Sequence, residues 1–341
     1  FFHTNLCGIL AGHIVYDVGS AHAVLHMQMG IEGTDGVDEQ LVHGDFAAVV
    51  AQHQQALGIG EGFGKACGFV DVHADLIHFA NLFHLAQQRL RDNTKLYFCA
   101  SKYEIENLSK PVYDYAGYDI LKLTGVPRYD GLEDRSEKII LFSPTWRMNS
   151  AMPVTANEGV SRDYNPNFKD TDYYKVYNSL INNPRLLDAA REYGYRIQYV
   201  LHPIVSPQAK DFTKNRFVEI IPSIGDVSYE KLFCEASLMV TDFSGVQFDF
   251  AYMRKPVVYL HHNDIPQHYE EGTFHYTTMG FGEICHTNDE LIDVLCDYMK
   301  KNCQMPEVYR KRADDFFHYS DHKNCERIYP IMLEHTKSLQ R

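Results

Sequence analysis

The sequence lacks three features that would each indicate a class of protein. It has no CxxC pair among its eight cysteines, no long uninterrupted apolar run, and no basic stretch followed by an apolar one at its start. Scattered cysteines fit reduced thiols in a cytosolic protein better than a disulfide framework or a zinc site. Because a long apolar run is missing, we expect no membrane-spanning helix. Because a basic stretch followed by an apolar one is missing at the start, we expect no signal peptide. Because the chain begins at Phe1, we expect it to be a fragment of a longer reading frame.

Positive charge is also in deficit. The formal net charge is −13, which argues against broad electrostatic binding to nucleic acid, so no nucleic-acid partner is expected. Hydrophobic residues make up 45% of the chain, which is ordinary for a globular protein and excludes wholesale disorder. A length of 341 residues favours two domains of about 150 residues each.

Proline is missing from the beginning of the chain, since all 13 prolines lie at or after Pro111. Residues 1–94 hold 9 of the 18 histidines and 12 of the 22 glycines, but only one tyrosine and one lysine. This composition is unusual for a folded α/β domain. Two hypotheses remain open: residues 1–94 are a divergent N-terminal domain, or they are not native to the rest of the chain, as an out-of-frame stretch would be.

From Leu96 onward, strand-like and helix-like segments alternate. Short apolar runs predict strands at 96–100, 120–124, 138–142, 196–201, 217–221, 238–241 and 256–260. Longer segments predict helices at 171–193, 226–236, 244–253, 288–303, 306–318 and 322–338. This alternation is typical of βαβ units around a parallel sheet. We predict the end of an N-terminal domain at 95–137, a doubly wound α/β domain at 138–305, and C-terminal helices at 306–341.

Polar residues follow four of the predicted strands. Ligands of open parallel sheets bind at the carboxyl ends of the strands. The candidates are Thr145 and Arg147 after the strand at 138–142, His202 after 196–201, Asp242, Ser244 and Gly245 after 238–241, and His261 and His262 after 256–260. We expect His261, His262 and the nearby His268 to be solvated, because they lie in a polar loop.

Ser244 and Gly245 open a predicted helix directly after a buried strand. The free N–H groups and positive dipole end of such a helix form a phosphate site, and glycine lets a ligand approach the backbone closely. The alternative is that Asp242 or Ser244 only caps the helix. Both interpretations stay open.

Arg147 and His202 are candidates for acting on a phosphate group. The Arg147 guanidinium can bind a phosphate through two hydrogen bonds, and the alternative for it is a surface ion pair. His202 can neutralise a leaving phosphate or move a proton near neutral pH; the alternative is a histidine that only fixes the loop before Pro203. Together these residues predict a substrate that carries a diphosphate.

The run TDFSGVQFDFAYMRKPVVYL at 241–260 resembles the signature of the CDP-glycerol glycerophosphotransferase family of teichoic-acid polymerases and primases. SPTWR at 143–147, YVLHP at 199–203, GVPRYD at 125–130 and FGEICHTNDELI at 281–292 also match motifs of that family, in order and spacing. The resemblance extends over about 96–338. Several motifs in register make it more specific than any one motif alone.

The resemblance implies a GT-B-like fold of two Rossmann-like doubly wound domains, of which the N-terminal one is incomplete or aberrant here. It implies transfer of glycerol phosphate, or a related polyol phosphate, from CDP-glycerol or a similar CDP-polyol to a lipid-linked teichoic-acid-like or capsule acceptor, with release of CMP. It places the enzyme on the cytoplasmic face of the cell membrane, in cell-wall synthesis. Arg147 and His202 would be catalytic, and Thr145, Asp242, Ser244 and Gly245 would bind the donor. No cofactor and no metal are implied.

The sequence departs from the family pattern at several positions. The family's His-Gly-Thr-Pro-Leu-Lys motif, whose histidine is the expected general base, is absent from residues 1–94, and His43-Gly44 matches only its first two residues. Gly245 stands where a serine is common, and Glu271-Gly272 stands where Arg-Gly is common. Two alternatives therefore remain: a GT-B glycosyltransferase that uses a nucleotide-sugar, and a catalytically inactive nucleotide-binding remnant.

Overall fold

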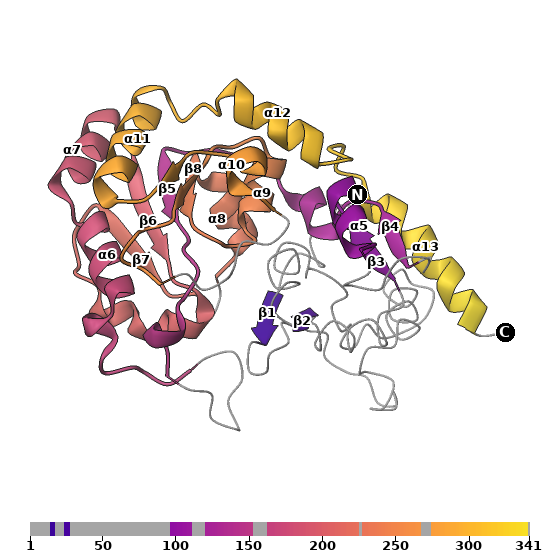
Figure 1. The fold of residues 1–341 in the computed structure, drawn as a ribbon, viewed down its shortest axis with the longest axis horizontal. Coiled ribbons are helices and arrows are strands. Elements are labelled where there is room, and N and C mark those ends of the chain that lie inside the picture. Colours follow the sequence, from indigo (N-terminus) through magenta and orange to yellow (C-terminus); the bar gives the residue numbers. More distant parts are fainter. Residues whose placement is uncertain are drawn as a thin grey trace. The chain divides into compact units, whose positions relative to one another are not determined.

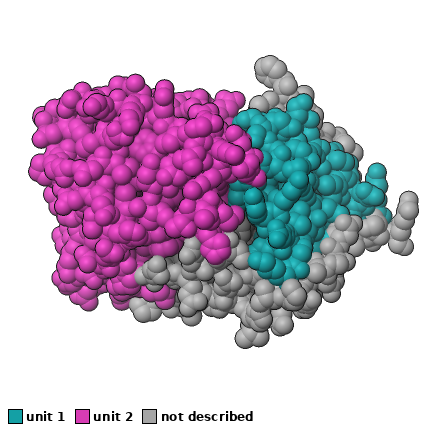
Figure 2. All heavy atoms as spheres, turned by 45° about the horizontal axis from the view of Figure 1, so that its top comes forward, with its two compact units in different colours: residues 1–131, 316–341 teal, residues 132–315 magenta. Residues whose placement is uncertain are grey.

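The structure is a computed structural model that describes residues 14–17, 24–27, 96–110, 120–152, 162–224, 227–266 and 274–339. The chain divides into two compact units, which Figure 2 colours separately. Unit 1 comprises residues 1–131 and 316–341, and unit 2 comprises residues 132–315. The predicted doubly wound segment, 138–305, lies wholly in unit 2.

Unit 2 is built on one parallel sheet. Its strands are β5 (Ile139–Phe142), β6 (Arg196–Val200), β7 (Val218–Ile221), β8 (Leu238–Thr241), β9 (Val257–Leu260) and β10 (Ile284–Cys285). They are arranged in the order β10-β9-β8-β5-β6-β7, and all pairs are parallel. The chain runs outward from β5 to β7 and then returns to the other side of β5, so the strand order reverses between β5 and β8. This confirms the predicted doubly wound α/β fold class.

Helices cover both faces of this sheet. In Figure 1, α6, α7 and α11 gather on one face and α8, α9 and α10 on the other. Their bounds are α6 (Asp172–Ile181), α7 (Pro184–Tyr193), α8 (Tyr229–Glu235), α9 (Gln247–Tyr252), α10 (Tyr276–Met279) and α11 (Asn288–Lys300). A further helix, α12 (Glu307–Phe316), follows α11 along the chain. Single 3-10 segments lie at η4 (Met148–Ser150), η5 (Phe168–Asp170) and η6 (Pro203–Asp211).

The strands form where apolar runs can be buried on both faces. Every residue of β5, β8 and β9 is buried. This burial explains why these strands read as continuous apolar runs rather than as alternating patterns. The predicted strands are confirmed to within one or two residues. The sequence did not predict β10, because two residues are too short to form a recognisable run.

The single helix predicted at 171–193 is wrong, since α6 and α7 are separate helices. Asn183 has an extended backbone, with φ −68° and ψ 125°, and its side chain accepts a hydrogen bond from the N–H of Arg185. The ring of Pro184 disfavours helical geometry at the residue before it, and proline suits the first position of a helix. The chain therefore stops one helix and starts another at this point.

The helix predicted from Ser244 also begins later than expected. α9 starts at Gln247, after the cap residue Val246, and no side chain caps it. Neither Asp242 nor Ser244 acts as a helix cap, so the capping interpretation is wrong. Ser244 and Gly245 instead form a turn, in which the Ser244 carbonyl accepts a hydrogen bond from Gln247 and the Gly245 carbonyl accepts one from Phe248.

Unit 1 contains a parallel strand pair packed against a long helix. Its described elements are β1 (Ile14–Asp17), β2 (Val24–Met27), β3 (Tyr97–Cys99), α5 (Lys102–Leu108), β4 (Leu121–Leu123), η3 (Pro127–Gly131) and α13 (Asn324–Leu339). β3 pairs with β4 in parallel, and β1 pairs with β2 in antiparallel. Leu96 and Phe98 pack against Ile328 of α13.

The GVPRYD motif attaches α13 to this unit. The Asp130 carboxylate accepts hydrogen bonds from the N–H groups of Asn324, at 2.8 Å, and Cys325, at 2.7 Å, at the start of α13. Gly125 has a positive φ of 81°, and a Cβ there would collide with the side chain of Asn324. The motif therefore supplies the acceptor and the space that the N-terminus of α13 needs.

No helix in the described part of the chain is both long and apolar enough to cross a membrane.

Lys255, which precedes β9, is a buried cation that anchors α8. Its side chain is 2% exposed, and its Nζ donates hydrogen bonds to the carbonyls of Phe233, at 2.9 Å, and Cys234, at 2.8 Å, in the last turn of α8. Asp134 lies 3.5 Å from the same Nζ. Burial lowers the pKa of Lys255 from 10.5 to about 8.

Replacing this lysine tests the anchor. We expect Lys255→Met to lower the free energy of unfolding by about 1–3 kcal/mol at pH 7, because two buried carbonyls lose their donor. Between pH 8 and 10.5 the unfolded wild type binds a proton at this site that the folded protein does not, so the wild type gains stability relative to the variant as pH rises. Urea unfolding at several pH values measures both effects, with Lys214→Met on the surface as control. A difference that shrinks with rising pH would contradict the assignment.

Candidate functional site

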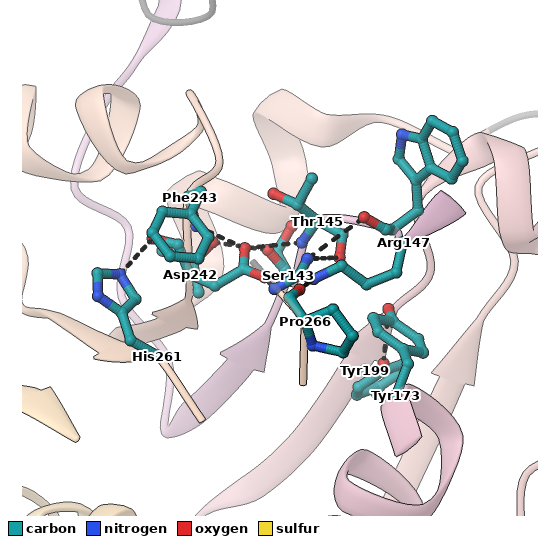
Figure 3. Close-up of polar contacts among 11 residues, drawn as sticks. Ser143, Thr145, Arg147, Tyr173, Tyr199, Asp242, Phe243, His261 and Pro266 are labelled. Carbon is teal, nitrogen blue, oxygen red and sulfur yellow. Dashed lines mark hydrogen bonds and ion pairs between the residues drawn. The ribbon is translucent and has the colours of Figure 1, made fainter. Parts of the chain in front are cut away.

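The carboxyl ends of four neighbouring strands carry the predicted site residues. In the sheet order β9-β8-β5-β6, these ends lead to His261, to Asp242, to Thr145 with Arg147, and to His202. The strand order reverses between β8 and β5, and open α/β sheets bind ligands at such a point. Figure 3 shows Thr145, Arg147, Asp242 and His261 close to this reversal. The fold thus brings together residues that are far apart in the sequence.

A buried ion pair joins the two central loops. Arg147 Nη2 lies 2.8 Å from Asp242 Oδ2, and the two side chains are 4% and 0% exposed. Burial alone would lower the pKa of Arg147, but the nearby Asp242 carboxylate raises it above its ordinary value. The alternative that Arg147 forms an ion pair at the surface is therefore wrong. Arg147 does form an ion pair, but in the interior.

The remaining donors of Arg147 bind main-chain carbonyls. Nη1 donates to the carbonyls of Thr145, at 2.7 Å, and Trp146, at 3.3 Å, and Nε donates to the carbonyl of Pro266, at 2.9 Å. The guanidinium thus holds its own loop, the end of β8 and the loop after β9 (Figure 3). With these donors engaged, two-pronged binding of a phosphate would require Arg147 to leave partners within the protein.

The second oxygen of Asp242 fixes the backbone of both loops. Oδ1 accepts hydrogen bonds from the N–H of Thr145, at 2.8 Å, and from the N–H of Phe243, at 2.7 Å. A fully buried carboxylate with these partners is not placed to contact a ligand directly. Asp242 orients Thr145 and the turn that begins at Phe243.

The Ser244–Gly245 turn and the Thr145 hydroxyl are the groups best placed to meet a ligand. Ser244 and Gly245 are both partly exposed. Thr145 is 7% exposed, and its Oγ1 makes no hydrogen bond within the described part of the chain. A buried hydroxyl without a partner is costly unless something else binds it. An incoming ligand oxygen at the reversal point would supply that partner.

His202 lies at the end of β6 and is partly exposed. Its Nδ1 accepts a hydrogen bond from the N–H of Ile204 at 3.3 Å, and its ring lies 6.3 Å from that of Trp146. Because Nδ1 acts as an acceptor, the proton of the neutral ring is on Nε2. The hydrogen-bond donor of the neutral His202 ring is therefore Nε2–H.

The prediction that His261 is solvated is wrong. Its ring stacks on Phe243, with centroids 4.2 Å apart and planes at 13°, and burial lowers its pKa. His262 is also more enclosed than predicted, since its side chain is 9% exposed and its Nδ1 accepts from the N–H of Asp264. No local pattern in the sequence indicates the contacts of His261, because its partners come from other elements.

Some predictions fall on residues that the structure does not describe. His43-Gly44, His268 and Glu271-Gly272 lie outside the described residues. Within the described ranges, no group of three or more His, Cys, Asp or Glu side chains is arranged to hold a metal ion.

Comparison with known proteins relates these features to a family. Residues 75–334 match the family described as CDP-Glycerol:Poly(glycerophosphate) glycerophosphotransferase. The minor teichoic acid biosynthesis protein GgaB of Bacillus subtilis is 41% identical over 243 residues, which are 71% of this chain and 26% of that protein. The teichoic acid poly(ribitol-phosphate) polymerase of Bacillus spizizenii is 24% identical over 251 residues, which are 65% of this chain and 35% of that protein. The chain thus spans about a quarter to a third of these relatives.

A solved structure shares the fold. The wall teichoic acid polymerase TagF superposes with a TM-score of 0.50 at 16% sequence identity, covering 74% of this chain and 62% of that one. A variant of TagF soaked with CDPG gives the same TM-score. At this identity the likeness establishes the fold, which confirms the predicted GT-B-like α/β class.

The buried ion pair can be tested by removing one charge. We expect Asp242→Asn to lower the free energy of unfolding by about 3–5 kcal/mol, because it leaves the Arg147 charge buried without compensation. Asp188→Asn is the matched control, since Asp188 pairs with Arg191 on the surface, where the two side chains are 68% and 55% exposed; there we expect a change below about 1 kcal/mol. Urea unfolding of both variants measures the difference. Equal effects would rule out a structural role for the Asp242 charge.

Proposed function

The chain belongs to the CDP-glycerol:poly(glycerophosphate) glycerophosphotransferase family, and we propose that it transfers glycerol phosphate, or a related polyol phosphate, from a CDP-activated donor to a hydroxyl group of a lipid-linked teichoic-acid-like or capsule acceptor, with release of CMP. The observation that supports this most directly is the Ser244–Gly245 turn. It follows β8 at the point where the strand order reverses. Asp242 Oδ1 binds both the N–H of Phe243, where the turn begins, and the N–H of Thr145, whose buried hydroxyl has no partner in the described part of the chain. Main-chain N–H groups of a turn and a free hydroxyl are suited to the oxygens of a diphosphate.

In the proposed reaction, the acceptor hydroxyl oxygen attacks the phosphorus that carries the polyol. A new P–O bond forms to the acceptor, the P–O bond to CMP breaks, and CMP leaves with the bonding electrons. The acceptor proton goes to a general base that none of these residues supplies, since His202 is assigned to the leaving group. Catalysis of this kind depends mainly on positioning and on offsetting charge.

We assign three roles to the site residues. Ser244, Gly245 and Thr145 would bind the diphosphate of the donor. His202 would donate Nε2–H to the departing phosphate. Arg147 and Asp242, which bind each other and the main chain, would hold these groups in place, and the Arg147 charge would act on the donor from the interior.

The proposed location is the cytoplasmic face of the cell membrane, where a lipid-linked acceptor would be met. The basic residues near the end of the chain do not by themselves support a lipid surface. Lys301 pairs with Asp297, Arg310 lies 3.8 Å from Glu307, and Arg312 donates to the carbonyls of Gly280 and Thr277. The proposed membrane location is therefore argued from the lipid-linked acceptor and not from a basic surface patch.

The reaction is tested by measuring CMP release. We expect the purified protein to release CMP from CDP-glycerol or CDP-ribitol when a lipid-linked glycerol-phosphate acceptor is present, because the donor is activated by the same leaving group in both. UDP-glucose and GDP-mannose serve as controls. Turnover of a nucleotide-sugar alone would favour a glycosyltransferase. Binding of CDP-glycerol by calorimetry without any CMP release would indicate an inactive remnant.

Residue roles are tested by substitution. We expect His202→Ala and Arg147→Ala each to lower donor turnover at least tenfold, which corresponds to about 1.4 kcal/mol of transition-state stabilisation. Arg147→Ala should also destabilise the fold, because it leaves the buried Asp242 carboxylate without its partner, whereas His202→Ala should leave thermal unfolding nearly unchanged, because His202 is partly exposed. His318→Ala, an exposed histidine, is the control. Unchanged rates in both site variants would remove these residues from the mechanism.

A further inference from the structure

The Ser244–Gly245 turn is held at both of its ends by aromatic side chains. On its N-terminal side, the ring of Phe243 stacks on that of His261 and meets the ring of Tyr276 edge-on, at 5.8 Å and 89°. On its C-terminal side, the fully buried side chain of Gln247 accepts a hydrogen bond from the Tyr259 hydroxyl at 2.7 Å. The Gln247 amide also donates to the Tyr276 hydroxyl at 3.3 Å.

His261 contacts three of the aromatic side chains around this turn. Its ring contacts Phe243 face to face, Tyr276 edge-on at 4.8 Å and 86°, and Tyr259 at 5.9 Å. Its main chain is fixed as well, because its N–H donates to the carbonyl of Cys285 at 2.9 Å. Figure 3 shows His261 on one side of Phe243 and Arg147 on the other. The Arg147 guanidinium carbon lies 5.8 Å from the Phe243 ring centre.

We propose that His261 is a positioning residue for the donor-binding turn, acting through its ring stack on Phe243. This inference rests on the proposed function, since it assigns the turn to the donor diphosphate. The contact of His261 Nε2 with the Asp242 carbonyl is 3.4 Å long, which is weak for a hydrogen bond. The flat stack, and not the nitrogen, therefore carries the role. Burial lowers the pKa of His261, so the ring that meets Phe243 is neutral at neutral pH.

The geometry explains why the turn needs such a residue. Ser244 and Gly245 precede α9, which spans only Gln247–Tyr252 and has no side-chain cap. A short uncapped helix does not hold its first turn rigidly. Fixing Phe243 on one side and Gln247 on the other restricts the backbone between them, which keeps its N–H groups in place before a ligand arrives.

The test measures hydrogen–deuterium exchange of the turn without donor and the affinity of the protein for the donor. Hydrogen–deuterium exchange of the 243–248 segment is measured in the wild type, His261→Ala and His261→Phe, with the β6 and β7 segments as internal reference. We expect exchange about tenfold faster in His261→Ala and near the wild-type rate in His261→Phe, because phenylalanine restores the flat stack. Equal exchange in the wild type and His261→Ala, or no rescue by phenylalanine, would overturn the inference.

Affinity for CDP-glycerol is then measured by calorimetry on the same proteins. We expect affinity to fall about tenfold in His261→Ala and to return in His261→Phe. Leu186→Ala is the matched control, because Leu186 is buried in α7, on the face of the sheet opposite α9 (Figure 1), so it should weaken unit 2 but leave both the exchange of 243–248 and the affinity unchanged. A loss in Leu186→Ala as large as in His261→Ala would reduce His261 to a general stabilising role and overturn the inference. If the wild type itself does not bind CDP-glycerol, the proposed function fails, while the exchange result still decides whether His261 positions the turn.

Discussion

The buried ion pair between Arg147 and Asp242 is the constraint on which the candidate site depends. Two charges removed from water are costly, and only close geometry with additional hydrogen bonds offsets that cost. Here Asp242 accepts two main-chain N–H groups and Arg147 donates to three main-chain carbonyls. Because these bonds reach the loops after β5, β8 and β9, they fix the mutual position of three segments that the sheet alone would leave free at their ends.

The inward-facing donors of Arg147 argue against direct binding of a phosphate by this residue. The sequence alone suggested that Arg147 faces a phosphate, since arginine is well suited to that contact. In the structure its donors face inward, and the groups left for a ligand are the Thr145 hydroxyl and the Ser244–Gly245 turn. In the proposed function, the cation thus organises the surface that would meet the donor without contacting the donor itself.

The sequence predicted the elements with strong local signals and missed those that depend on distant partners. Continuous apolar runs identified β5, β8 and β9, because a strand buried on both faces leaves that pattern. Pro184 should have indicated the break between α6 and α7, since proline restricts the residue before it. By contrast, nothing local distinguishes His261 from a solvated loop histidine. Its burial arises from Phe243 and Tyr276, which reach it only once the sheet has formed.

The attachment of α13 by Asp130 has a consequence for the order in which the chain folds. Unit 2 is one continuous segment, 132–315, whose sheet can form as soon as that segment has been synthesised. Unit 1 joins Leu96 and Phe98 to Ile328, and Thr124 accepts a hydrogen bond from Arg327, which lies 203 positions later. During synthesis from the N-terminus, the apolar strand pair of unit 1 must therefore wait, without its covering helix, until unit 2 has emerged from the ribosome. The segment made earlier is completed later, and its exposed strands are the part of the nascent chain that a chaperone would need to protect.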